Sequence, residues 1–223
     1  MFLYKFVFER IKDVFYSCKV EKVANELDDL LEGVVTDHII ALESNVAVNQ
    51  DFVSILLENW KQKRENGFSI DKDCIKAVTF DMLAGGTDTT STTLEWTMAM
   101  LMKNPDIMCK LQKEVRNISR GKSRITEDDL DKMQYLKAVI KESLRINIPV
   151  PLIARETRED VKEGLPGHPV WHAVNELALA NMVNMFDFAL PDAETTDDLD
   201  MAGAVGLSVG KKSPLLVVAN PQF

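Results

Sequence analysis

Residues 82–96, MLAGGTDTTSTTLEW, combine side chains that can carry chemistry with residues that disfavour a helix. Two adjacent glycines, Gly85 and Gly86, precede the carboxylate of Asp88 and the hydroxyl of Thr89. A carboxylate beside a hydroxyl can relay protons to a bound reactant. Relative to alanine, the glycines and threonines of this run cost on the order of 4 kcal/mol of helix propensity. A local conflict of this size is typical of strained or functional sites.

The residues on both sides of this run predict one long helix over 70–103. At about 100° per residue, its buried side is apolar, then small and hydroxylic for two turns, then apolar again. The residues on that side are Ile75, Val78, Met82, Gly85, Thr89, Thr92, Thr93, Trp96 and Met100. Small residues let a bulky group approach the backbone, and a bond from the Thr89 hydroxyl to the Gly85 carbonyl would distort the helix between Gly85 and Thr90. Spacing alone leaves a plain helix crossing lined with small residues equally open.

A second motif, KESLR at 141–145, places Glu142 and Arg145 three residues apart on a predicted helix. Alone, such a pair is usually a solvated salt bridge worth a few tenths of a kcal/mol. His168 and His172 have the i, i+4 spacing of a metal pair, but two histidines without a third ligand are more often surface residues.

Composition excludes some function classes. The chain has 223 residues, 35 acids against 26 bases and a net charge of −9, which disfavours a nucleic-acid binder because phosphate contacts need a basic face. The three cysteines form no disulfide or zinc pattern, which favours a reducing compartment. The apolar N-terminal stretch carries too many charges for a spanning helix or a secretory signal.

Periodicity and caps predict a mainly α fold with a small β region at the C-terminal end. Expected helices cover 20–43, 51–65, 70–103 with Ser69 as N-cap, Pro105 to a loop near 119–124, Thr126 to the prolines at 149 and 151, and a segment after Gly167. Short apolar runs at 186–190, 205–209 and 214–218 are expected to be strands, and 151–157 to be extended.

The ordered motifs GGTDTT (85–90), KESLR (141–145), PVPLIARE (149–156) and NELALANMVNMFDFALP (175–191) together resemble the haem-thiolate monooxygenases. This is the cytochrome P-450 family, in particular its plant microsomal branch, and the resemblance extends from residue 20 to the C-terminus. It implies that Asp88 and Thr89 deliver protons to iron-bound dioxygen, with Gly85 and Gly86 beside the haem. It also implies that Glu142 and Arg145 brace the haem's proximal side and that Arg155 contacts a propionate.

The same resemblance exposes a departure at the iron ligand. In the family, a glycine-rich loop ending in Cys-Pro-Gly precedes the NELALAN helix and its cysteine binds the iron. Ten residues before Asn175 stands Leu165, followed by Pro166 and Gly167, which do match. Leu165 follows Glu142 by only 23 residues, whereas the family has several tens more. We therefore expect residues 1–223 to be a single incomplete domain with an internal deletion near 161–167, lacking also the family's N-terminal part.

By resemblance, intact members insert one oxygen atom into a small lipophilic substrate. They take electrons from an NADPH-dependent flavoprotein reductase at the cytoplasmic face of the endoplasmic reticulum. Without an anchor, this chain could instead be cytosolic. A leucine cannot coordinate iron, so we expect this chain to be catalytically inactive and not to bind haem. The alternative is a non-enzymatic helical protein that retains the scaffold and binds a partner through exposed apolar faces.

Overall fold

The computed structural model describes residues 18–44, 51–63, 71–151, 168–191, 196–197 and 199–222. The expectations for Ser69, Arg155, Leu165, the N-terminal stretch and the extended segment after Pro151 lie outside these residues. The chain divides into two compact units, residues 1–85 and 86–223, and each is described by itself.

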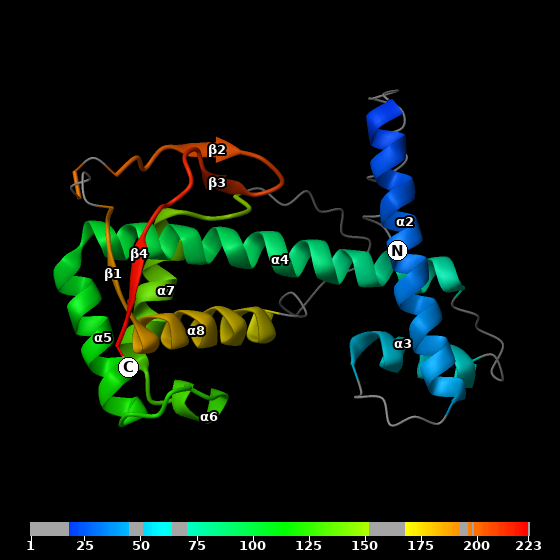
Figure 1. The fold of residues 1–223 in the computed structure, drawn as a ribbon, viewed down its shortest axis with the longest axis horizontal. Coiled ribbons are helices and arrows are strands. Elements are labelled where there is room, and N and C mark those ends of the chain that lie inside the picture. The colour runs from blue at the N-terminus through cyan, green and yellow to red at the C-terminus, as the bar shows by residue number, and fades with distance from the viewer. Residues whose placement is uncertain are drawn as a thin grey trace, which may run out of the picture. The chain divides into compact units, whose positions relative to one another are not determined.

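The helices follow the predicted order (Figure 1). They are α2 (Cys18–Glu43), α3 (Phe52–Lys63), α4 (Lys72–Lys103), α5 (Pro105–Ser119), α6 (Glu127–Leu130), α7 (Gln134–Ile146) and α8 (His168–Met185). With the strands at the C-terminal end, they confirm the mainly α fold. In the part of the chain that the structure describes, no helix combines the length and the apolar character needed to cross a membrane.

Helix α4 is regular throughout, including the glycine–threonine run. Every residue from Lys72 to Lys103 is α-helical, so the distortion predicted between Gly85 and Thr90 is wrong. Threonine hydroxyls do bond back along the helix, from Thr93 to the Thr89 carbonyl at 2.8 Å. Such a bond can share the carbonyl with the backbone N–H, so it does not require the helix to open.

The first unit contains α2, α3 and α4 up to Gly85. Its core is a small apolar cluster made of Val35, Val53, Leu57 and Ile75. Asp51 caps α3 by accepting the Ser54 amide at 2.8 Å. Asp71 likewise accepts the Cys74 amide at 2.7 Å, so α4 takes Asp71 as its N-cap where the sequence predicted Ser69.

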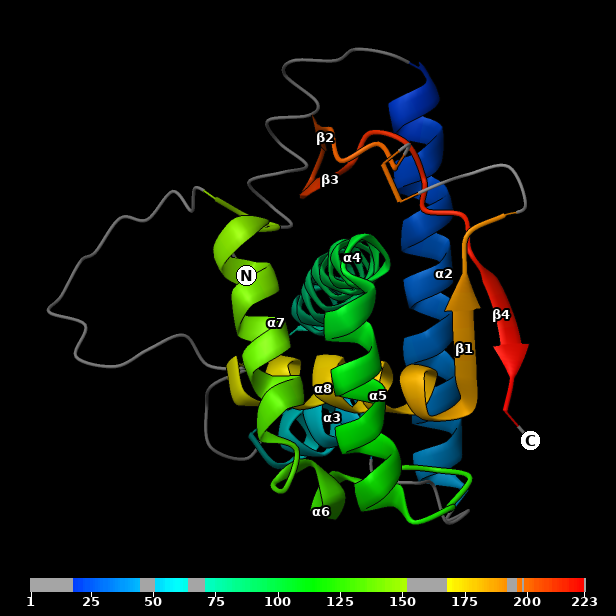
Figure 2. The same ribbon diagram turned by 90° about the vertical axis from the view of Figure 1, so that its left-hand side faces the viewer.

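The second unit packs α5, α7 and α8 with the C-terminal half of α4 around a larger core. Figure 2 looks along α4 and shows α5 and α7 passing side by side, with α8 running across both. The fully buried residues of this core include Leu111, Val115, Leu136, Ile140 and Leu179. In α8, the central residues Leu179, Ala180 and Val183 are buried, whereas Leu177, Met182 and Met185 are only partly buried.

The helix predicted from Thr126 onward is in fact two helices. The carboxylate of Asp129 accepts the backbone N–H and the hydroxyl of Thr126, as the capping pattern predicted, but α6 ends at Leu130. Glu114 of α5 then accepts the backbone N–H groups of Tyr135 and Leu136, both at 2.9 Å. This side chain satisfies the free donors at the start of α7, so a new helix begins there.

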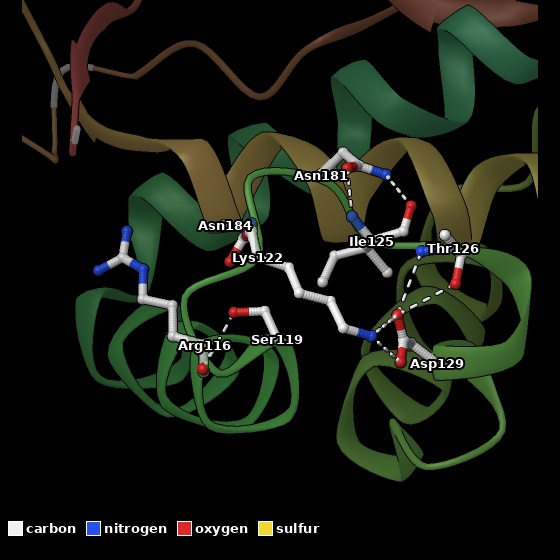
Figure 3. A network of polar contacts seen from close by, with 8 residues as sticks. All are labelled: Arg116, Ser119, Lys122, Ile125, Thr126, Asp129, Asn181 and Asn184. Atoms are coloured by element: carbon white, nitrogen blue, oxygen red, sulfur yellow. Dashed lines mark hydrogen bonds and ion pairs between the residues drawn. The ribbon is translucent and has the colours of Figure 1, made fainter.

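Polar contacts tie α8 to the connection between α5 and α6 (Figure 3). Asn181 accepts the Ile125 amide at 2.9 Å and donates to the Ile125 carbonyl at 3.2 Å. Asn184 donates to the Lys122 carbonyl at 3.1 Å, and the Lys122 ammonium lies 3.2 Å from Asp129. The polar residues of NELALANMVN therefore fix the position of α8.

Two small antiparallel pairs follow α8. Strand β1 (Phe186–Ala189) pairs with β4 (Val218–Pro221), and β2 (Gly203–Val205) pairs with β3 (Val209–Lys211). The strand predicted over 205–209 is mainly the turn of this hairpin, closed by the Gly206 N–H donating to the Ser208 carbonyl at 2.9 Å. The strand predicted over 214–218 is irregular until Val218.

Candidate functional site

The hydroxyl face of α4, made of Thr89, Thr92, Thr93 and Thr97, is the centre of the candidate site. Helical geometry places these side chains along one side of α4. Thr92 and Thr93 are buried, as is Thr97. Buried hydroxyls are normally hydrogen-bonded, so the hydrogen-bond partners of these threonines show which elements this face contacts.

Thr89 receives its contact from α8. The Trp171 indole Nε1–H donates to the Thr89 hydroxyl oxygen across 3.2 Å. The side-chain amide of Asn175, which is fully buried, donates to the Trp171 carbonyl at 2.8 Å, and the His172 ring meets the indole edge-on at 5.0 Å. Trp171 was not predicted as a site residue. The available signal was a large aromatic near the start of a helix, whose N–H needs a partner when it is buried.

Thr92 and Thr97 meet other elements of the second unit. Thr92 and Ser208, in the β2–β3 turn, have their hydroxyl oxygens 2.8 Å apart. Thr97 donates to the Thr93 carbonyl at 2.7 Å and to the Ser143 hydroxyl of α7 at 2.8 Å. The hydroxyl face therefore contacts α8, the β2–β3 turn and α7 in succession.

Asp88 lies at the edge of this face and is half-buried. Its Oδ2 atom is buried and has no hydrogen-bond partner among the described residues. A buried carboxylate oxygen in this state ordinarily bonds a water, an ion or a ligand. The role of Asp88 in proton transfer stays a prediction from the motif.

The glycine pair is open on its outer side. A Cβ atom added at Gly85 or at Gly86 would meet no atom within 4 Å. Among the described residues, no atom stands where a Cβ would lie, so a clash with a larger side chain does not explain why these two positions are glycine.

Glu142 and Arg145 form the predicted pair on the surface of α7. The guanidinium donates through two nitrogens to the two carboxylate oxygens, each at 2.8 Å, with 56% of the Glu142 side chain and 69% of the Arg145 side chain exposed. The hydrogen bond and charge of Arg145 lower the pKa of Glu142, and those of Glu142 raise the pKa of Arg145. Such an exposed pair contributes little stability by itself.

The GGTDTT and KESLR motifs are connected where α4 crosses α7, but their side chains do not form one site. Ser143, next to Glu142, bonds Thr97, which follows Thr89 by eight residues or about 12 Å along α4. Glu142 also borders a cavity of about 230 Å³ between α4, α5 and α7. This is below the usual range of small-molecule pockets, about 300–1,000 Å³. Among the residues described, no group of three His, Cys, Asp or Glu side chains could hold a metal ion.

Comparison with known proteins gives a consistent set of similarities. The family model described as Cytochrome P-450 matches residues 4–165. The chain is 40% identical to psoralen synthase of Ammi majus over an alignment of 262 residues, gaps included, that covers 91% of this chain and 52% of the relative. It is 41% identical to psoralen synthase of Pastinaca sativa over 254 residues (87% and 53%), and 36% identical to (+)-menthofuran synthase of Mentha piperita over 263 (92% and 53%). The chain thus spans about half the length of these relatives.

Proposed function

The chain belongs to the cytochrome P-450 family, and from that premise we propose that its intact counterpart is a haem-dependent monooxygenase of small lipophilic substrates, whereas the chain as written is inactive. Relatives named as synthases support the first part. Electrons would come from NADPH through a flavoprotein reductase. The family is typically microsomal, which supports the cytoplasmic face of the endoplasmic reticulum for the intact protein.

Leu165 is the single observation that carries the proposed inactivity. It stands where the motif alignment requires the iron-binding cysteine, directly before the matching Pro166 and Gly167. A hydrocarbon side chain has no lone pair to give to iron, and haem iron in this family needs a thiolate. The deletion proposed near 161–167 would have removed that cysteine with its loop.

Two features of the comparisons support such a deletion. The family-model match stops at Leu165, although the pairwise alignments draw on about nine-tenths of the chain. The alignment with the Ammi majus enzyme is 262 residues long, which exceeds the whole 223-residue chain. That relative therefore carries residues inside the aligned region that have no counterpart here.

Two contacts among the described residues argue against a fit to the haem that the family implies. Thr89, whose hydroxyl would serve dioxygen, accepts a hydrogen bond from Trp171 of α8. The Glu142–Arg145 pair stays on the surface of α7. The features that suit the family's site are the space for a Cβ at Gly85 and Gly86 and the Asp88 Oδ2 atom, which has no hydrogen-bond partner among the described residues. Together these contacts support a protein that retains the motifs without their chemistry.

The second candidate is a non-enzymatic protein that binds a partner through exposed apolar side chains. The observation that favours it is the β2–β3 hairpin, where Val205 is 91% and Leu207 77% exposed. Exposed apolar groups at one tip are typical of a contact surface rather than of a packed core. Stable accumulation of the chain in cells would favour this function.

The proposal is tested by reconstituting the wild-type chain and the Leu165→Cys variant with haem, reducing them and adding carbon monoxide. We expect neither to give the red-shifted Soret band of a thiolate complex. The variant should also fail, because the residues before 165, Glu-Asp-Val-Lys-Glu-Gly, carry three acids that would raise the pKa of a thiol. A thiolate band from the wild type would refute the proposed inactivity, and one from the variant alone would refute the need for the missing loop.

A further inference from the structure

We propose that Trp171 fastens α8 directly to the hydroxyl face of α4 and thereby fills, with protein, the space where the family resemblance places the haem. This inference deepens the proposed function and rests on it. Its subject is the Trp171–Thr89 contact, in which an indole N–H occupies the hydroxyl that the motif would offer to dioxygen.

A flat macrocycle between two protein groups needs about 3.5 Å of van der Waals separation on each side, or about 7 Å between the groups. The Trp171 nitrogen and the Thr89 oxygen are 3.2 Å apart. No ring system can lie between these two atoms while the contact exists.

The centre of α8 is held by burial in the core of the second unit. Leu179, Ala180 and Val183 are fully buried in the core of the second unit. Asn175 bonds the carbonyl of Trp171 itself, one turn along the helix. Moving Trp171 away from Thr89 would therefore require the first turns of α8 to shift relative to the buried centre of the same helix.

The β2–β3 hairpin contacts the next turn of α4. Trp96 donates its indole N–H to the Val209 carbonyl at 2.9 Å, and Thr92 bonds Ser208 beside it. The β2–β3 hairpin thus covers the α4 face that follows Thr89. Protein groups contact this face over successive turns of α4. This supports the alternative that the small residues line a helix crossing, which the spacing in the sequence left open.

The test observes the indole N–H groups of the ¹⁵N-tryptophan-labelled chain by NMR, with Trp171→Phe to assign the Trp171 signal. Thr89→Val removes the acceptor at constant shape. The loss of one net hydrogen bond predicts about three- to tenfold faster solvent exchange of the Trp171 indole. The Trp96 signal, whose N–H goes to Val209, should keep its rate. Ser91→Ala is the matched control, because Ser91 is an exposed hydroxyl on the same helix bonded to the Asp88 carbonyl.

Equal Trp171 exchange in wild type and Thr89→Val would overturn the contact, and so would a wild-type chain without a protected Trp171 indole. Ferric haem is then added to the wild type. An unchanged Trp171 signal is expected. If the chain binds one equivalent of haem and Thr89→Val still speeds exchange of the Trp171 indole, the proposed function and the exclusion of haem are refuted, whereas the Trp171–Thr89 contact stands. If Thr89→Val leaves the exchange of the Trp171 indole unchanged and haem does not bind, only the Trp171–Thr89 contact is refuted.

Discussion

Thr97 and Ser143 form the buried hydroxyl pair at the α4–α7 crossing. Thr97→Val keeps the shape of the side chain but leaves the Ser143 hydroxyl without this partner in a buried position. An unsatisfied buried hydroxyl costs about 1–3 kcal/mol. We expect the urea midpoint of the second unit to fall accordingly, measured by circular dichroism. Ser91→Ala, at an exposed site of α4, is the control, and a Thr97→Val loss no larger than that of Ser91→Ala would contradict the pair's role.

The His38–Asp51 pair predicts a pH dependence for the first unit. The Ser54 amide and then His38 lower the pKa of Asp51 from 3.8 to about 2, and the Asp51 hydrogen bond raises the pKa of His38 above 6.5. The contribution of Asp51 to the stability of the first unit is present above pH 3.8 and is lost as pH falls toward about 2. The His38 contribution is complete below pH 6.5 and is lost as pH rises through its folded pKa. Stability of α2 and α3 should therefore be greatest between about pH 4 and 6.5.

The check is an NMR titration of His38 in the wild type and in Asp51→Asn. The amide retains an oxygen acceptor for the Ser54 N–H but carries no charge for the imidazole. The pKa of His38 should fall toward 6.5 in the variant. An unchanged His38 titration would show that Asp51 does not hold the ring.

Asp88, Thr89, Glu142 and Arg145 stand in compact motifs, so residue type and spacing could single them out from the sequence, and their roles stay predictions. The partners that decide how Thr89 and Thr92 are used, Trp171 and Ser208, lie 82 and 116 residues further along the chain. Pairings over such separations depend on tertiary packing, which local patterns do not encode.

At the scale of elements, long periodic segments were predictable and their interruptions were not. The helix expected from Thr126 has regular apolar spacing, yet it breaks between Leu130 and Gln134. The cause is Glu114 on another helix, which supplies acceptors for the start of α7. Similarly, the apolar run at 205–209 became a turn because Gly206 bonds back to Ser208.

Glu114→Ala is expected to fray the first turn of α7. The change removes the acceptor of two backbone N–H groups, and loss of a helix N-cap costs about 0.5–2 kcal/mol. Hydrogen exchange by mass spectrometry should show faster exchange in peptides covering 134–138. Glu114→Gln, which keeps one acceptor oxygen, should show a smaller change. Equal protection in wild type and Glu114→Ala would exclude the capping role.

At the scale of the whole molecule, the two units have separate cores. Leu57 is fully buried in the first core and Leu111 in the second. A buried Leu→Ala change costs about 2–5 kcal/mol. We expect Leu57→Ala to lower hydrogen-exchange protection in α2 and α3 while α5, α7 and α8 keep theirs, and Leu111→Ala to do the reverse. Loss of protection in both units from either change would indicate a single cooperative core.

The exposure of apolar side chains differs between parts of the chain. Exposed apolar faces favour association of the chain or binding of a hydrophobic dye. Met82 is 58% exposed, but Leu136 and Ile140 are buried. Fully covered core residues in the second unit therefore restrict the expected dye binding to the exposed part of α4 and to the β2–β3 hairpin.

The central claim, that the hydroxyl face of α4 is closed by protein and receives no haem, is tested most directly by titrating the wild-type chain with ferric haem while following tryptophan fluorescence. Haem bound at this face would lie beside Trp171, whose indole donates to the Thr89 hydroxyl, and near Trp96, a residue of α4 whose indole donates to the Val209 carbonyl of β3. We predict no saturable quenching at one haem per chain. Saturation at one equivalent, abolished by replacing Thr89 and Trp171, would contradict the account.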